Sequence, residues 1–172
     1  MELIVLIGLQ ASGKSTFYRQ RLAGTHALVS KDLLRAARNP GRRQTQLIEE
    51  ALRAGRSLVV DNTNPSPEER VPLAQLGHGH GAVVTGYYFE PDVSKSLERN
   101  RLREGRARVP DVAIFATAKK LVRPSPGEGF DRLFDVRTAD GMCFHVSDPK
   151  QGPGSPRGDE GGTPDGKRSP IG

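Results

Sequence analysis

The chain has 172 residues, enough for one domain with a sizeable core and too few for two ordinary domains. It carries 26 lysines and arginines against 20 aspartates and glutamates, and the net charge of +6 favours anionic partners. Cys143 is the only cysteine, so no internal disulfide can form, and the apolar run Leu3–Ile7 is far too short to span a membrane. We therefore expect a cytoplasmic protein without membrane association, rather than a disulfide-stabilised secreted scaffold or an integral membrane protein.

Short apolar runs alternate with charged stretches of helix length. In chain order, we expect strands at Leu3–Ile7, Ala27–Val29, Leu58–Val60, Ala82–Phe89, Leu133–Val136 and Met142–Val146. The candidate helices between them are Lys14–Ala23, Asp32–Arg38, Gln44–Ala54, Ser66–Leu76, Asp92–Leu102 and Asp111–Val122. Pro72 would kink or restart the fourth of these helices. Strands that alternate with helices predict a mainly parallel sheet flanked by helices on both faces.

The first strand is followed by a phosphate-binding pattern, G-x-x-x-x-G-K-S/T, at Gly8–Ser15. In such a loop, successive backbone N–H groups converge on one phosphate, and the following helix points its positive end at the same anion. We expect Lys14 to reach the β- and γ-phosphates of a nucleoside triphosphate and the Ser15 hydroxyl to ligate Mg²⁺. The residues expected to surround the phosphates are Gly8, Ala11, Ser12 and Gly13. Kinases, GTPases and motors share this loop, so it does not identify the reaction.

The second strand leads into a segment in which an aspartate and an arginine lie three residues apart, Asp32 and Arg35. Ligands of open parallel sheets bind beyond the carboxyl ends of the strands, so Asp32 is expected near the phosphate loop. A carboxylate there is suited to accept the proton of an attacking hydroxyl, and a guanidinium is suited to hold an acceptor phosphate. Alternatively, Asp32 only caps a helix and Arg35 is a solvated surface residue.

The third strand ends in Asp61, and the turn residues Asn62–Pro65 follow. A carboxylate delivered beside a phosphate loop suits a contact with metal-bound water, the nucleophile or a basic partner. Asn62–Pro65 also fit a turn before the next helix.

Five arginines lie between residues 99 and 108, starting at a helix end and running into a glycine-containing loop: Arg99, Arg101, Arg103, Arg106 and Arg108. Such a segment is suited to close over a triphosphate and to stabilise charge on the transferring phosphoryl group. The alternative is a basic, solvated helix end favoured by the helix dipole.

The last 26 residues differ in composition from the rest. They contain seven glycines and five prolines, are electrically neutral, and have Ile171 as their only large apolar residue. Such a segment cannot bury enough apolar surface to offset its chain entropy. We expect one folded domain at residues 1–146 and a disordered tail at residues 147–172, with a short docking segment as the alternative.

Two further features carry less chemistry. Cys143 lies in an apolar run and is expected to pack in the core. The run His78-Gly79-His80 lacks a second ligand pair, so a metal site is not expected there.

Taken together, the motifs resemble those of the 5′-hydroxyl polynucleotide kinases of phage and animal nucleic-acid repair. The stretches that carry the resemblance, in chain order, are Gly8–Thr16, Val29–Arg35, Val60–Pro65, Arg99–Arg103 with Val109-Pro110, and Arg123–Phe130. The likeness covers about residues 3–137. It implies a three-layer α/β fold of the P-loop kinase type, with a mainly parallel sheet and an Arg-rich lid.

The resemblance also implies an activity and its site. The chain would be an ATP-dependent kinase that transfers the γ-phosphate to the 5′-hydroxyl of a DNA or RNA end. Lys14 and Ser15 would hold phosphate and Mg²⁺, with Thr16 on the α-phosphate side. Asp32 would be the general base and Arg35 would bind the acceptor's 3′-phosphate. Asp61 matches an acidic position near the reaction centre, and Arg99 and Arg103 match lid residues on the donor phosphates.

Departures from the family leave alternatives open. An extra residue around Glu104-Gly105 leaves open whether Arg103 or Arg106 contacts the donor. The fused phosphatase's Asp-x-Asp-x-Thr signature does not occur, so a phosphatase activity is not predicted. The alternative functions are a small-molecule hydroxyl kinase, acting on a sugar, antibiotic or nucleotide-sugar, and a non-enzymatic nucleotide-dependent switch. Nucleic-acid 5′-hydroxyl ends are the expected partner, and no protein partner is identifiable.

Overall fold

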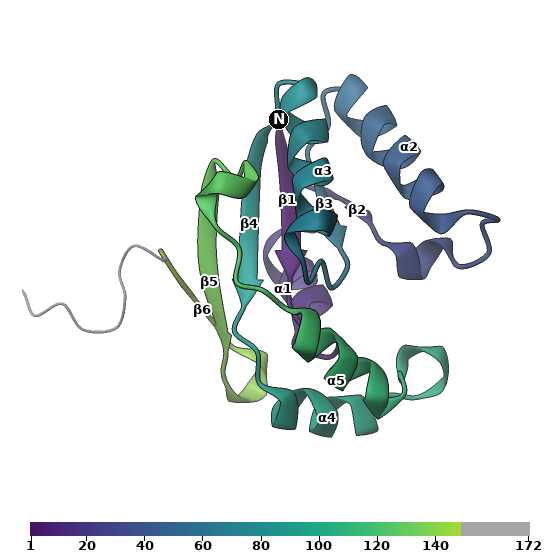
Figure 1. Cartoon of the computed structure of the whole chain (residues 1–172), viewed down its shortest axis with the longest axis vertical. Helices are drawn as coiled ribbons and strands as arrows, with labels where there is room; N and C mark the ends of the chain where they lie inside the picture. Colours follow the sequence, from purple (N-terminus) through teal and green to yellow (C-terminus); the bar gives the residue numbers. More distant parts are fainter. Residues whose placement is uncertain (149–172) are drawn as a thin grey trace, which may run out of the picture.

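A computed structural model describes residues 1–148. Six strands form one sheet in the order β2-β3-β1-β4-β5-β6, with β1 at its centre (Figure 1). The strands are β1 (Glu2–Ile7), β2 (Ala27–Val29), β3 (Leu58–Asp61), β4 (Val83–Phe89), β5 (Arg132–Thr138) and β6 (Phe144–Ser147). The first five are parallel, and β6 closes one edge antiparallel to β5. The predicted mainly parallel sheet is therefore confirmed.

Helices cover both faces of the sheet, with α2 and α3 on one face and α1 on the other (Figure 1). The α-helices are α1 (Lys14–Arg21), α2 (Pro40–Arg53), α3 (Pro67–Gly79), α4 (Val93–Arg101) and α5 (Asp111–Lys120). Four short 3-10 turns complete the described part of the chain: η1 (Lys31–Leu34), η2 (Gly105–Ala107), η3 (Pro126–Glu128) and η4 (Asp140–Met142).

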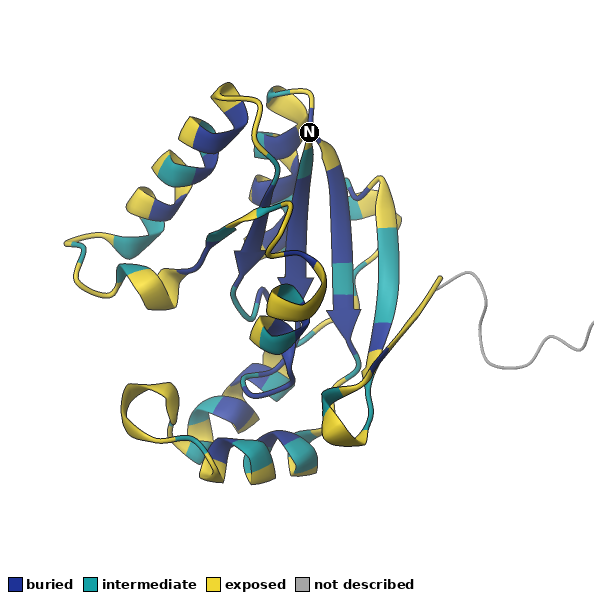
Figure 2. Ribbon diagram, turned by 180° about the vertical axis from the view of Figure 1, so that it is seen from behind, coloured by how far each residue is buried: buried dark blue, intermediate teal, exposed yellow. Residues whose placement is uncertain are grey.

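The central strand β1 is apolar on both of its faces, and this pattern positions the site. Leu3, Val5 and Ile7 belong to the core under α2 and α3, whereas Ile4 and Leu6 belong to the core under α1. Such a strand fits only between two helical layers. Figure 2 shows the resulting buried strands inside an exposed shell. In the register, Leu6 lies opposite Asp61, so β1 and β3 end side by side.

The helix predicted at residues 32–38 after β2 does not form, and only the single turn η1 is found there. Pro40 disfavours a helical conformation in the residue before it, and Asn39 is extended, with φ −138° and ψ 91°. The Asn39 side chain then caps α2, which begins at Pro40 rather than at the predicted Gln44.

Two smaller expectations concern Pro72 and Cys143. α3 continues through Pro72 to Gly79, so the predicted restart does not occur. Because proline has no N–H, Pro72 cannot donate to the carbonyl of Glu68, four residues earlier. Both residues are exposed, so water can bond to that carbonyl. Cys143 is exposed rather than packed, because the adjacent Phe144 takes the buried position at the start of β6.

Within residues 1–148, no helix is both long and apolar enough to cross a bilayer. The predicted tail lies outside the described residues, apart from residues 147 and 148. Its disorder and the domain boundary stay predictions.

Candidate active site

The loop between β1 and α1 is shaped by two glycines. A Cβ at Gly8 would lie 2.9 Å from the Cβ of Phe89, which belongs to the packed strand β4. Gly13 has φ +103°, and a Cβ there would lie 3.0 Å from the ring of Phe144. Both positions therefore require glycine. Between them, Ala11 and Ser12 are buried.

Lys14 is folded back onto the loop that carries it. Its Nζ donates hydrogen bonds to the carbonyl oxygens of Leu9 (2.5 Å) and Gly8 (3.0 Å). Burial lowers the pKa of Lys14 to about 8; the nearby charge of Asp61 opposes this shift, and that of Arg103 adds to it. An anionic phosphate in the loop would supply a counter-charge that favours the protonated amine.

Ser15 and Asp61 join the loop to the neighbouring strand. The Ser15 hydroxyl donates a 2.6 Å hydrogen bond to Oδ2 of Asp61, which is buried at the end of β3. A hydroxyl and a carboxylate are the hard oxygen ligands that Mg²⁺ prefers, so the pair fits that ion. Thr16, the next residue, is partly exposed, and its hydroxyl accepts a hydrogen bond from Arg19 at 3.1 Å.

The three residues after Asp61 connect separate parts of the site. Asn62 Oδ1 accepts from the Lys31 amide at 3.0 Å, and the Thr63 carbonyl accepts from the Gly8 amide at 3.0 Å. Asn64 Nδ2 donates to the carbonyl of Leu6 at 2.7 Å. The segment, which the sequence assigned to a turn as well as to the family motif, therefore ties the phosphate loop to the residues after β2.

A buried ion pair between Arg70 and Glu128 supports the segment that follows Asp61. Arg70 of α3 is fully buried, and its Nη1 donates to the carbonyl of Asn64 at 3.0 Å. Its Nε and Nη2 donate to the two carboxylate oxygens of Glu128 at 2.6 and 2.9 Å. The predicted resemblance at Arg123–Phe130 thus falls on a segment that contacts the site indirectly.

Asp32 lies in η1, and Arg35 directly follows that turn. Oδ1 of Asp32 accepts from Nη2 and Nε of Arg35 at 2.6 and 3.2 Å, and the side chains are 76% and 51% exposed. Arg35 Nη1 also donates to the carbonyl of Arg106 at 3.4 Å. Asp32, Arg35 and the lid segment therefore meet. The three-residue spacing of Asp32 and Arg35 had predicted the contact between those two.

The lid, residues 99–109, is closed at its base by a buried amide. Asn100 Nδ2 donates to the carbonyl of Val109 at 2.7 Å, and the Val109 amide donates back to Asn100 Oδ1 at 3.0 Å. Burial lowers the pKa of Arg103, while the negative charges of Asp32 and Asp61 oppose that shift. Arg103 Nη1 donates to the carbonyl of Ala107 at 3.3 Å, and the side chain lies near enough to both carboxylates for their charges to affect its pKa.

Arg106, the other candidate lid arginine, has a different place. It is exposed, and it contributes its backbone carbonyl rather than its guanidinium to the contact with Arg35. The structure thus brings Arg103, not Arg106, to the charged centre.

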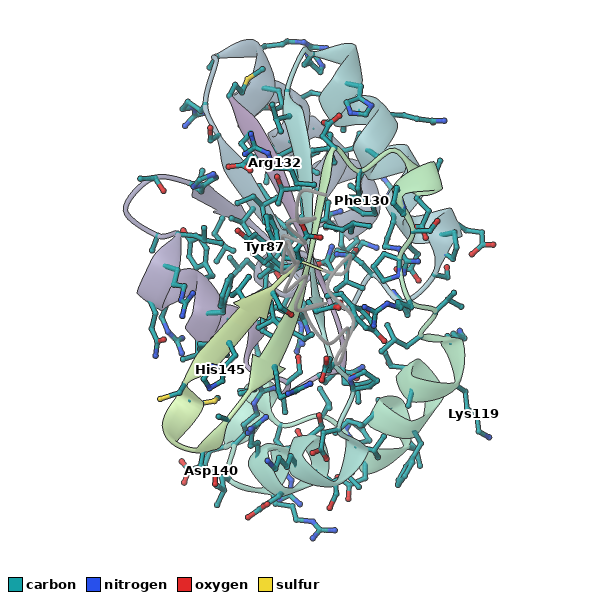
Figure 3. The ribbon with its side chains drawn as sticks, turned by 90° about the vertical axis from the view of Figure 1, so that its left-hand side faces the viewer. Tyr87, Lys119, Phe130, Arg132, Asp140 and His145 are labelled. Atoms are coloured by element: carbon teal, nitrogen blue, oxygen red, sulfur yellow. The ribbon has the colours of Figure 1, made fainter. Side chains whose placement is uncertain are left out.

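Arg99 lines a cavity of about 380 Å³ beside the phosphate loop. The cavity lies between α4 and the turn from β5 to β6, and its lining includes Ser12, Lys95, Thr138 and Asp140. Thr138 Oγ1 donates to the carbonyl of Ser12 at 3.0 Å, which joins the cavity to the loop. Figure 3 shows Asp140 at this end of the sheet and Arg132 at the opposite end.

The geometry is that of a P-loop kinase domain, in which a phosphate loop and a lid share the carboxyl edge of a mainly parallel sheet. Sequence comparison identifies the family. Residues 3–124 match the AAA_33 family of AAA domains, and the chain belongs to that family.

Two curated relatives support the predicted resemblance. A bifunctional polynucleotide phosphatase/kinase of Schizosaccharomyces pombe is 24% identical over 142 residues, which are 78% of this chain and 33% of that protein. A putative bifunctional polynucleotide phosphatase/kinase of Acanthamoeba polyphaga mimivirus is 30% identical over 142 residues, with the same two coverages. The chain spans about a third of the length of these relatives.

Among solved structures, a gluconokinase from Sinorhizobium meliloti 1021 is similar in fold. Its TM-score is 0.60 at 19% identity, with 82% of this chain and 85% of that chain covered. At this identity the likeness shows the fold alone. The fold and the family are therefore established, whereas the activity and its acceptor are matters for proposal.

Proposed function

We propose that the chain is an ATP-dependent kinase that transfers the γ-phosphate to the 5′-hydroxyl of a DNA or RNA end. The observation that carries this proposal is the convergence of four charged groups at one edge of the sheet. Asp61 accepts from Ser15 of the phosphate loop at 2.6 Å, and Arg35 joins Asp32 to the carbonyl of Arg106 in the lid. The charges of Asp61, Arg103 and Asp32 all affect the pKa of Lys14, which agrees with this arrangement. A phosphate-binding lysine beside two carboxylates and a lid arginine suits phosphoryl transfer to a hydroxyl.

On the donor side, the loop and the lid would hold ATP. Lys14 and Arg103 would face the β- and γ-phosphates, and Thr16 would lie on the α-phosphate side. Arg99 would contact the donor from the cavity beside Ser12, which is suited in size and position to the nucleoside. The residues that would surround the phosphates with backbone groups are Gly8, Ala11, Ser12 and Gly13.

Ser15 and Asp61 would hold Mg²⁺, the former as a direct ligand. When bound, the ion would neutralise charge on the donor phosphates. Within residues 1–148, no group of three or more His, Cys, Asp or Glu side chains gathers into a metal site. The site would therefore depend on ATP oxygens as well as on this pair.

On the acceptor side, Asp32 would take the proton from the 5′-hydroxyl while the oxygen of that hydroxyl bonds to the γ-phosphorus. The bond from that phosphorus to the bridging oxygen of ADP breaks in the same transfer. Arg35 would bind the acceptor's 3′-phosphate, which gives its guanidinium an anionic partner other than Asp32. A bound acceptor would thus free a lone pair on the Asp32 carboxylate.

Two observations favour a polynucleotide end over a small acceptor. Two of the curated relatives are named as a bifunctional and a putative bifunctional polynucleotide phosphatase/kinase. Asp32 and Arg35 are also largely exposed, at 76% and 51%, which suits the end of a long polymer. A cytoplasmic location, with no membrane association and no identified protein partner, is part of this proposal.

The gluconokinase-like fold keeps a small-molecule hydroxyl kinase as the second candidate. Acceptor-stimulated ADP release separates the two. DNA and RNA oligonucleotides with 5′-hydroxyl ends should stimulate ADP release, whereas gluconate, other sugars, aminoglycosides and free nucleosides should not. Stimulation by the small molecules alone would reject the polynucleotide acceptor in favour of the second candidate.

A further inference from the structure

We propose that Asn62 is a positioning residue that holds Asp32 in place for the reaction, an inference that rests on the proposed function. Asn62 directly follows Asp61 at the end of β3. Its amide connects the turn that carries Asp32 to the sheet and to α2.

The turn that carries Asp32 receives little support from the core. No residue of η1 is buried, and Asp32 is 76% exposed. The strand pairing that precedes it ends with Val29 opposite Val60. The turn packs mainly against α2, with Leu34 half-buried, and such a turn opens easily, so its position depends strongly on individual hydrogen bonds.

Asn62 supplies such a bond directly beyond the end of the strand pairing. Its Oδ1 accepts from the amide of Lys31, the residue before Asp32, at 3.0 Å. The Ser30 hydroxyl accepts from the Asp32 amide at 3.2 Å, but that contact is local and shapes only the turn itself. The Asn62 contact is the one that relates the turn to the end of β3.

Gln44 of α2 orients the Asn62 amide. Asn62 Nδ2 donates to Gln44 Oε1 at 2.8 Å, and Gln44 is only 5% exposed. With Nδ2 engaged in this way, Oδ1 is the atom that faces the Lys31 amide. A flipped amide would set one N–H against another and one oxygen against another. The Lys31 amide can only donate, so it requires Oδ1 of Asn62 to face it, and buried Gln44 holds the other end of the Asn62 amide in place.

Asp61, the last residue of β3, and Asn62, the residue after it, thus serve opposite sides of the site. Asp61 reaches Ser15 at 2.6 Å on the donor side, while Asn62 reaches Lys31 at 3.0 Å on the acceptor side. A shared strand end would therefore fix the distance between the donor and the general base.

An ordinary turn-forming asparagine would bond to nearby backbone. Here both polar atoms of Asn62 bond to groups 31 and 18 residues away in sequence. Displacing a catalytic group by about 1 Å can cost about a hundredfold in rate. We therefore expect Asn62→Ala to lower kcat by about 10- to 100-fold, with KM for ATP changed less than about twofold.

The test compares Asn62→Ala with Gln44→Ala, using whichever hydroxyl acceptor the wild-type chain phosphorylates. Gln44→Ala should lower kcat in the same direction and by less. Gln46→Ala is the matched control, because Gln46 is an exposed glutamine of the same helix, and its rate should equal that of the wild type. Thermal melting of each variant separates misplacement from unfolding, and Gln44→Ala decides the matter if Asn62→Ala does not fold.

A double-mutant cycle with Asp32→Ala, measured in single turnovers, identifies the path of the effect. If Asn62 acts through Asp32, adding Asn62→Ala to Asp32→Ala should not lower the residual rate further. Equal losses in both backgrounds, or an unchanged kcat in Asn62→Ala, would overturn the positioning role while leaving the kinase function intact. A wild-type chain that phosphorylates no acceptor would overturn the proposed function, and this inference with it.

Discussion

The Ser15 hydroxyl donates a 2.6 Å hydrogen bond to the Asp61 carboxylate, which joins the start of α1 to the end of β3. The register that sets Leu6 opposite Asp61 brings these two side chains together. The pair is the feature that most directly links the fold to the proposed Mg²⁺ site.

Asp61→Asn should raise the Mg²⁺ concentration needed for half-maximal activity. The amide keeps the size of the side chain but removes its negative charge, so Mg²⁺ would be held less tightly. Loss of a group that supports a metal ligand typically costs about 10- to 100-fold in metal affinity or activity. A Mg²⁺ titration of ADP release measures the shift, and an unchanged titration would contradict the assignment of Asp61.

ATP affinity should fall as the pH rises above about 8, the pKa to which burial lowers Lys14. Bound phosphate favours the charged amine and raises that pKa, so ATP binding takes up a proton in this range. Below about pH 8 the amine is already charged, and the affinity should be flat. Above it, Kd should rise by up to about tenfold per pH unit.

Calorimetry in buffers of different ionisation enthalpy measures this proton uptake directly. Near pH 8.5 to 9 the apparent binding enthalpy should depend on the buffer, whereas near pH 6.5 the contribution of Lys14 should vanish. An affinity that stays constant between about pH 7 and 9.5 would contradict the burial of Lys14.

Arg103→Ala should be far more damaging than Arg106→Ala. The pKa of Arg103 responds to Asp32 and Asp61, whereas Arg106 is exposed and offers its carbonyl. Removal of one group that stabilises the transition state costs about 10²- to 10³-fold in kcat. Arg106→Ala, which keeps that carbonyl, should stay within a few fold of the wild type. The reverse order in steady-state kinetics would assign the donor contact to Arg106 instead.

Arg70→Met should destabilise the fold. Arg70 is fully buried, and its loss leaves Glu128 and the Asn64 carbonyl without their partner. Breaking a buried ion pair costs about 3–5 kcal/mol, which for a chain of this length lowers Tm by roughly 10 °C. The matched control is Arg53→Met, because Arg53 makes an exposed pair with Glu49 and should change stability by less than about 1 kcal/mol. Equal melting temperatures for the two variants would contradict this difference.

The strands and the phosphate loop could be predicted because local sequence determines them. The run Leu3–Ile7 is apolar on both faces, and the glycine spacing at Gly8 and Gly13 is required by close contacts and by backbone conformation. The helix at residues 32–38 was wrong because Pro40 outweighs the helical preference of the residues before it.

Other parts of the site depend on contacts between distant residues, which periodicity does not reveal. Arg70 and Glu128 are 58 residues apart, and nothing in their surroundings signals that they pair. Asn100 and Asn62 lie in stretches that carry the family resemblance, but the sequence assigned no role to either side chain. The run D-N-T-N-P contained the available signal, since two amides and a carboxylate directly follow a buried strand. The choice between Arg103 and Arg106 required the folded lid.

The central claim, phosphoryl transfer to a 5′-hydroxyl with Asp32 as the base, is tested most directly by labelled-ATP transfer to oligonucleotides. With Mg²⁺ and γ-labelled ATP, DNA or RNA ending in a 5′-hydroxyl should acquire the label at that end. The same oligonucleotide already bearing a 5′-phosphate should not. Asp32→Ala should lose most of the transfer while ATP affinity changes little. Absence of label from every 5′-hydroxyl end, or full activity of Asp32→Ala, would contradict the account.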